Sequence, residues 1–465
     1  MAFIITLCAL LFLMFVAYRG YSVILFAPIA AMGAVLLIDP TLVAPMFTGL
    51  FMDKMVNFIK LYFPVFLLGA IFGKVIELSG FSKSITAWII KLVGRERAML
   101  SIVLVCALLT YGGVSLFVVV FAVYPFAAEM FRESNIPKRL IPGTIALGAF
   151  TFTMDALPGT PQIQNIIPTT FFKTDIYAAP TLGLIGSLFI LVCGIIYLES
   201  CRRSALKAGE GYGKDLINEP APFNHEKLPH PVLAILPLML VGVMNKVFTM
   251  LIPQFYGKEI SFLPAVIGTP KPVVQQISSV AAIWAVEGAL LIGILAVFAF
   301  AGKTVIDRFG EGSKQAISGA LLATMNTASE YGFGAVIAAL PGFLVIANGL
   351  SQIPNPLINE AITVSSLAGI TGSASGGLGI ALAAMADTFI ANAHAAGIPM
   401  EVLHRVAAMA SGGMDTLPHN GAVITVLAVT GLTHKQSYKN IFAITIIKTL
   451  AVFVVIGVYY MTGIV

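Results

Sequence analysis

Two short segments each place an aspartate inside an apolar stretch, and they share one residue order. Residues 154–158 read MDALP and residues 414–418 read MDTLP, so Asp155 and Asp415 lie 260 positions apart. An ionisable side chain in such surroundings is a functional candidate, and proton or cation coupling is the chemistry that it suggests. His419 follows the second segment directly and belongs to the residue type that titrates near neutral pH. The alternative is that both carboxylates only cap unwound backbone and that the histidine is a plain hydrogen-bond donor.

A helix-capping residue follows each of these segments. Thr160 stands before Pro161, and Asn420 holds the equivalent position in the second segment. Threonine and asparagine are favoured N-caps, and proline is favoured as the first helical residue. Each segment therefore predicts a helix that starts within the apolar region, with free N–H groups and the positive end of its dipole exposed. Such helix starts bind anions, and a carboxylate is the ligand that we expect.

Two glycine-rich segments supply further helix starts within apolar regions. Residues 111–115 read YGGVS, and residues 371–377 read TGSASGG. We expect both to form hairpin tips whose hydroxyl groups donate to the same anion. The residues predicted to bind the substrate share a place at a tip or at a helix start, and they are Gly112, Gly113, Ser115, Thr160, Ser373, Ser375, Gly376 and Asn420. The alternative is that glycine and proline only kink these helices for packing.

The composition places all these residues in a membrane. The chain has 465 residues, of which 58% are hydrophobic and 11% are charged, and its mean hydropathy is +0.94. Soluble proteins carry about 25% charged residues. The net charge of +5 is spread over short loops, so it does not indicate a nucleic-acid partner. The four cysteines show no metal-type spacing, and we expect neither a metal nor another cofactor.

Apolar runs of about 20 residues predict membrane-spanning helices. Clear runs occupy residues 2–18, 22–45, 57–80, 180–199, 231–253, 276–300, 317–345 and 440–462. The predicted fold is an all-α polytopic membrane protein with two inverted repeats, each with a re-entrant hairpin and an interrupted transmembrane helix. Its parts are an extra N-terminal helix (1–21), repeat 1 (22–199) with hairpin 98–131 and broken helix 139–170, a cytoplasmic linker (200–230), an extra helix (231–253), and repeat 2 (276–465) with hairpin 358–396 and broken helix 399–432.

Loop charge predicts the orientation, because cytoplasmic loops are rich in lysine and arginine. The basic loops 81–97, 132–139, 200–230 and 302–314 are therefore expected on the cytoplasmic side. The flanks of the second hairpin, 346–357 and 394–400, carry no lysine or arginine, so that hairpin is expected to enter from outside. Both termini are then predicted on the outer, periplasmic face of a bacterial inner membrane.

Taken together, the two glycine-rich tips and the two aspartate–proline breaks resemble the gluconate permease family of the ion-transporter superfamily. The resemblance covers nearly the whole chain and is strongest in 98–185 and 371–440. It implies proton symport of sugar acids or short hydroxy acids by a homodimer in which a transport domain moves against a fixed scaffold. The first break reads LPGTP over residues 157–161, which is closer to members linked with 3-hydroxybutyrate and other short carboxylates than to gluconate carriers.

Three other readings remain open. One is a symporter that uses sodium to import di- or tricarboxylates, and another is a channel. The third is a membrane-embedded enzyme, which would need a nucleophile or metal constellation, and neither that nor a G-x-S-x-G or H-E-x-x-H motif is present. An ATP-driven pump is unsupported because the sequence contains no P-loop. Four further acidic residues in apolar surroundings either pair structurally or take part in transport, and they are Glu77, Glu287, Glu330 and Asp387.

Overall fold

The computed structural model describes residues 1–465 except 20, 95–96, 115, 214–215, 221–227, 264–271, 344, 346–348, 350–352 and 419. The described part is helical apart from one antiparallel hairpin of β1 (Glu259–Phe262) and β2 (Val273–Gln276). Within it, 6 helices are long and apolar enough to cross a bilayer. The predicted all-α polytopic membrane fold is therefore confirmed.

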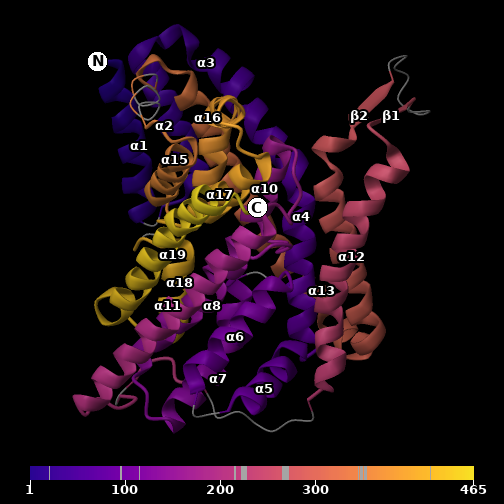
Figure 1. Cartoon of the computed structure of the whole chain (residues 1–465), viewed down its shortest axis with the longest axis vertical. Coiled ribbons are helices and arrows are strands. Elements are labelled where there is room, and N and C mark those ends of the chain that lie inside the picture. Colours follow the sequence, from indigo (N-terminus) through magenta and orange to yellow (C-terminus); the bar gives the residue numbers. More distant parts are fainter. Residues whose placement is uncertain are drawn as a thin grey trace.

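Long helices form a bundle along one side of the molecule (Figure 1). Its members are α4 (Met52–Leu78), α12 (Pro231–Tyr256) and α13 (Ala281–Ala339). The short N-terminal elements pack near its upper end, and they are α1 (Ala2–Tyr18), α2 (Val23–Ile38), η1 (Pro40–Leu42), α3 (Val43–Met46) and η2 (Phe47–Phe51).

The basic segment 302–314 was expected to be a loop, and this expectation was wrong. The segment is helical, but α13 consists of two helical stretches that meet at a kink at Ala301, where φ is −135° and ψ is 22°. The rings of Phe298 and Phe309 lie 5.1 Å apart across this kink, so the chain changes direction just before the basic residues. The stretch after the kink can turn its charged residues to water while its apolar ones face the bundle. Val305 is buried, and Gly312 lies against Lys74 of α4.

Residues 81–97 were likewise expected to be a loop, but most of this segment forms α5 (Phe81–Val93). Its buried apolar residues Phe81, Ile85 and Ile89 recur every four positions, while Lys83 and Lys91 are exposed. This spacing is that of an amphipathic helix lying along the basic end of the molecule.

Two helical hairpins and two interrupted helices make up the rest of the interior. The first hairpin is α6 (Ala98–Tyr111) with α7 (Leu116–Glu133), and the second is α15 (Pro356–Thr371) with α16 (Ala374–Ala395). The first interrupted helix consists of η4 (Lys138–Leu140), α8 (Ile141–Ala149), α9 (Phe152–Asp155) and α10 (Ile163–Phe172), and the second of α17 (Met400–Ser411) and α18 (Gly421–Thr430). The division of the chain into repeats at the expected bounds stays a prediction.

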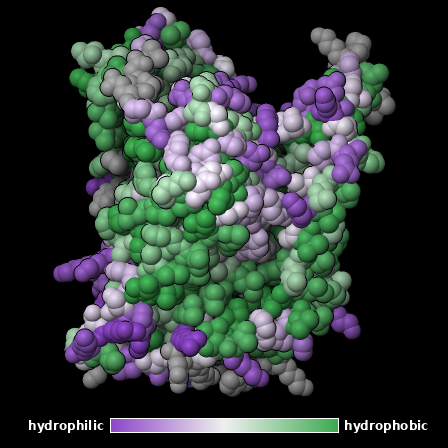
Figure 2. All heavy atoms as spheres, viewed as in Figure 1, coloured by the Kyte–Doolittle hydropathy of each residue, from purple (hydrophilic) through white to green (hydrophobic). Residues whose placement is uncertain are grey.

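Two long helices, α11 (Pro180–Lys207) and α19 (His434–Thr462), complete the fold. They pack on each other and present an apolar outer surface, visible as the broad green area in the lower half of Figure 2. On α11 this surface includes the exposed side chains of Leu184, Leu188 and Ile196. Exposed apolar side chains in such number fit contact with lipid.

The basic segments meet at one end of the molecule. Arg139 bonds to Glu210, and its carbonyl accepts a hydrogen bond from Ser437 at 2.7 Å. Ser84 donates to the carbonyl of Pro229 at 2.6 Å. These contacts join loops that the charge pattern assigned to the cytoplasmic side, and the N-terminus lies at the other end (Figure 1).

Candidate substrate and ion site

The two helix breaks lie side by side in the interior. Asp155 and Asp415 are both buried. A Cβ atom added to Gly412, just before the second break, would lie 1.7 Å from Oδ2 of Asp155. Lys448 of α19 donates to the carbonyl of Phe150, just before the first break, at 3.1 Å. Residues about 260 positions apart in the chain are thus brought into one site.

Arg405 of α17, in the second interrupted helix, hydrogen bonds to groups of the first break. Its guanidinium donates to the carbonyl of Asp155 at 3.0 Å, to that of Ala178 at 2.8 Å and 3.1 Å, and to Oδ1 of Asn165 at 3.0 Å. His404 also contacts this amide, at 3.1 Å. Broken backbone at membrane depth requires such internal partners, because lipid offers none. Arg405 is fully buried, so it satisfies carbonyls that the unwound turn exposes.

The two aspartates differ in their partners. The carboxylate of Asp415 forms an ion pair with Lys448. Oδ2 of Asp155 is buried and has no hydrogen-bond partner among the described residues. Among the described residues, Asp155 is therefore the carboxylate with no ion pair of its own, although Lys448 and Arg405 both lie close to it.

The tip of the first hairpin packs against the first break. Tyr111 donates to the carbonyl of Pro158 at 2.9 Å, and Gln162 donates to the carbonyl of Thr110 at 2.7 Å. Gly113 has φ +94°, which favours glycine, and a Cβ there would lie 3.4 Å from Pro161. Gly112 faces α12, because a Cβ there would lie 2.4 Å from Leu238.

The tip of the second hairpin packs against the second break in the same way. Asn420 donates to the carbonyl of Gly372 at 2.8 Å, and a Cβ at Gly369 would lie 3.1 Å from that of Met414. The predicted substrate-binding residues therefore fall into two groups, one at each tip with its own break. Ser375 lies slightly apart, with its hydroxyl 3.2 Å from that of Thr327 on α13.

Of the two capping residues expected after the breaks, one is confirmed. Asn420 caps α18, since its Oδ1 accepts from the N–H of Val423 at 2.9 Å. Thr160 was wrongly expected to cap α10, which begins only at Ile163. Its hydroxyl instead donates to the carbonyl of Thr153 at 2.7 Å. The backbone stays extended at Gln162, with φ −78° and ψ 146°, so Thr160 is too far from the first helical turn.

Two predicted site residues cannot be placed, and two buried basic residues of the site were not predicted. Ser115 and His419 lie outside the described part of the chain. Arg405 and Lys448 were missed, although a basic residue within an apolar run was a visible signal. Among the described residues, no group of three or more His, Cys, Asp or Glu side chains is placed to hold a metal ion.

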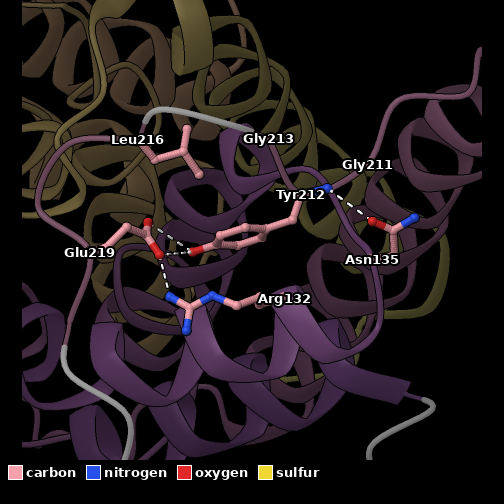
Figure 3. Close-up of a pocket in the computed structure, with 7 residues that line it drawn as sticks. All are labelled: Arg132, Asn135, Gly211, Tyr212, Gly213, Leu216 and Glu219. Carbon is pink, nitrogen blue, oxygen red and sulfur yellow. Dashed lines mark hydrogen bonds and ion pairs between the residues drawn. The ribbon is translucent and has the colours of Figure 1, made fainter.

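An open pocket of about 580 Å³ lies at the basic end, remote from the breaks (Figure 3). Glu219 at its wall accepts from Tyr212 at 3.1 Å, and pairs with Arg132 and with Lys138. Burial raises the pKa of the Glu219 carboxyl, but the two basic partners outweigh burial and hold its pKa below the usual value. Glu219 thus links its segment to Arg132 of α7 and to Lys138, and its single negative charge leaves this group of three with a net positive charge.

The comparisons with known proteins agree with this architecture. No protein-family model matches the chain. The chain is 61% identical over 474 residues to the uncharacterized transporter YxjC of Bacillus subtilis (strain 168), with 100% of both chains covered.

Two solved structures share the fold. The YdaH transporter of Alcanivorax borkumensis, whose topology is described as unusual, aligns over 92% of this chain and 90% of its own, with TM-score 0.51 and 13% identity. MtrF of Neisseria gonorrhoeae, described with a class of antimetabolite efflux pumps, aligns over 91% and 85%, also with TM-score 0.51 and 13% identity. At this identity the likeness shows a common multi-pass transporter fold with re-entrant hairpins.

Proposed function

We propose, from the premise that the chain belongs to the same transporter family as YxjC of Bacillus subtilis, that it imports small organic anions together with a proton. The family makes the chain a secondary membrane transporter and not an enzyme. The substrates that we propose are hydroxy acids such as 3-hydroxybutyrate or gluconate. The resemblance of its tips and breaks to those of the gluconate permease family supports this class.

One observation carries the proposal: two interrupted helices meet in the interior, beside a carboxylate with an unpartnered oxygen. The caps at Asn420 and Ser373 mark helix starts whose dipoles favour negative charge. Interrupted helices near the midplane are typical of substrate and ion sites in secondary transporters. Gly112, Gly113, Ser115, Thr160, Ser375 and Gly376 are proposed to complete the substrate site.

The proposed driving ion is a proton that binds at Asp155. A carboxylate substrate brings a negative charge into a site of low dielectric, and helix dipoles compensate only part of it. Protonation of Asp155 removes a second negative charge and favours substrate binding. Asp415 and His419 are proposed to support this step. The pairing of Asp415 with Lys448 makes Asp155 the principal group.

The proposed orientation places the basic end in the cytoplasm and both termini outside. The proposed assembly is a homodimer in which the hairpins and breaks move as a transport domain. Cysteines placed at Ser134 and at Gly397 test the orientation, since a membrane-impermeant thiol reagent should reach them from opposite sides. Labelling of both from one side would contradict it.

The deciding experiment is uptake of labelled acids into proteoliposomes under separate proton and sodium gradients. We expect an inward proton gradient to drive accumulation of 3-hydroxybutyrate or gluconate, with saturable counterflow that a channel does not show. Uptake driven only by sodium would favour the citrate-like alternative and would overturn the proton as driving ion. No uptake of any tested carboxylate would overturn the substrate class.

A further inference from the structure

The carboxylate of Glu330 on α13 reaches the first turn of α16. A Cβ atom added to Gly376 would lie 1.7 Å from Oε2 of Glu330, so this approach requires a glycine. Ser373, the N-cap of α16, hydrogen bonds with the same carboxylate. The Glu330 side chain therefore occupies the point where an anion bound to this helix start would lie.

Two independent features make this position an anion site. α16 is a 22-residue helix; the N–H of Gly376 donates to the N-cap Ser373 at 3.0 Å, and the N–H groups before it lack partners within the helix. Oε2 of Glu330 is buried and has no hydrogen-bond partner among the described residues, while the residue is only 3% exposed. A buried carboxylate oxygen without a partner is costly. The fold thus holds an acidic group, incompletely satisfied, at a helix start that attracts anions.

The surroundings are polar and closely packed. Thr327 lies one turn before Glu330 on α13, and its hydroxyl is 3.2 Å from that of Ser375 in the first turn of α16. A Cβ at Gly334 would lie 2.9 Å from Cα of Ile380, so the two helices are in direct contact above the site. Polar side chains of α13 and α16 thus lie within one helical turn of Glu330, and Ser373 is the hydroxyl that contacts its carboxylate.

We propose that the carboxylate of the transported acid binds at the first turn of α16, in the position that the Glu330 side chain occupies in this structure. The substrate carboxylate takes over the first turn of α16 when the Glu330 side chain withdraws. Protonation of Glu330 favours this exchange, because the helix dipole holds a neutral Glu330 side chain less strongly than a charged one. This inference rests on the proposed function and adds to it the place where the substrate carboxylate binds.

The competition should depend on pH through Glu330 itself. Burial and the Ser373 hydroxyl are the influences on its carboxyl group, and among the described residues it forms no ion pair. Charged groups on the packed helices include Asp53, Lys54, Lys60, Lys74 and Glu77 on α4, Lys246 on α12, Glu360 on α15 and Asp387 on α16.

The test uses the full-length protein in lipid nanodiscs, with acetate, 3-hydroxybutyrate and gluconate as probes. Thermal unfolding is followed against the concentration of each sodium salt, with sodium chloride keeping the ionic strength constant. Glu330→Gln removes the competing charge and keeps the shape, so we expect half-maximal stabilisation at about ten-fold lower concentration at alkaline pH, where Glu330 is charged in the wild type. The advantage over the wild type should shrink as pH falls towards neutral, because Glu330 then becomes neutral in the wild type too.

A matched control is Glu360→Gln on α15, where both carboxylate oxygens are also buried without partners among the described residues. We expect it to bind the acids as the wild type does. Glu330→Asp, which draws the charge back from the helix start, is a second variant should Glu330→Gln not fold, and it should also bind more tightly than the wild type.

The inference is overturned if Glu330→Gln or, in its place, Glu330→Asp needs the same or a higher concentration of every acid, or if no acid stabilises any variant. Uptake measurements distinguish a failure of this inference from a failure of the proposed function. Import by the wild type with an unchanged concentration dependence in Glu330→Gln rejects the inference alone. Tighter binding of acetate by Glu330→Gln without import of any acid by the wild type rejects the proposed function alone.

Discussion

The two breaks carry one sequence motif but use it differently. At the second break, Asp415 is paired with Lys448 and Asn420 caps the helix that follows. At the first break, Oδ2 of Asp155 has no partner among the described residues, and Thr160 does not cap. The carbonyls of the first break are held instead by Arg405, a residue of the second interrupted helix.

This difference indicates a division of roles between the copies. The second break is internally balanced, so it can act as a rigid support. The first depends on its neighbour for its backbone partners and leaves a carboxylate open to a proton. A duplicated motif can therefore supply a structural copy and a titrating copy within one site.

The largest loss of stability should come from removing the ion pair between Asp415 and Lys448 at the second break. Lys448→Met leaves Asp415 charged and unpaired in the interior, so the free energy of unfolding should fall by about 3–5 kcal/mol. Unfolding in detergent measures this. The double variant Lys448→Met with Asp415→Leu should recover most of the loss. A double variant as unstable as the single one would show that the ion pair is not what balances this break.

A comparable loss is expected when the first break loses the Arg405 guanidinium. Arg405→Met strips the carbonyls of Asp155 and Ala178 of partners, and each buried unsatisfied group costs about 1–3 kcal/mol. Arg203→Met is the matched control, because the Arg203 side chain is 71% exposed and pairs only with Glu199 at the surface. If both variants unfold at the same temperature, Arg405 does not hold the first break.

Capping should separate stability from binding at the second break. Asn420→Ala removes the N-cap of α18 and should lower the free energy of unfolding by about 0.5–2 kcal/mol. Asn420→Asp keeps a capping oxygen but loses the amide N–H group that donates to the carbonyl of Gly372, so part of the stability should be lost as well. The added negative charge should in addition weaken binding of a carboxylate. Equal acid binding by Asn420→Asp and the wild type would remove Asn420 from the substrate site.

The smallest effect is expected at the basic end, where Glu219 is 27% exposed and pairs with the buried Lys138 and the exposed Arg132. The pKa of Glu219 is lowered in the folded protein by Lys138 and Arg132, despite burial. Its stabilising contribution is therefore present above the unfolded pKa of about 4.3 and is lost as pH falls through the lower folded value. Glu219→Gln should lower stability at neutral pH by about 1 kcal/mol or less. A difference from the wild type that grows on acidification would contradict this assignment.

The sequence predicted local features well because their signals are local. The glycine-rich tips and the proline after each aspartate located both hairpins and both interrupted helices within a few residues. Asn420 was recognised as a cap for the same reason. The helical form of residues 302–314 was missed because charged residues suggest a loop, although they fit equally well on the outer side of a helix.

The contacts between the breaks could not be predicted in this way. Arg405 and Asp155 lie in different interrupted helices, and nothing in the chain near either residue indicates the other. The same holds for Lys448 and Phe150, and for Glu330 and Gly376. Only the folded arrangement shows which of two similar aspartates is already neutralised.

The most direct test of the central claim is the proton flux that accompanies substrate entry. Proteoliposomes with an enclosed pH-sensitive dye receive 3-hydroxybutyrate or gluconate from outside, and the internal pH is recorded together with labelled substrate. We predict that the wild type carries protons inward with the acid, and that Asp155→Asn exchanges labelled acid but moves no protons. Substrate-dependent acidification by Asp155→Asn at the wild-type rate would contradict Asp155 as the proton-binding group.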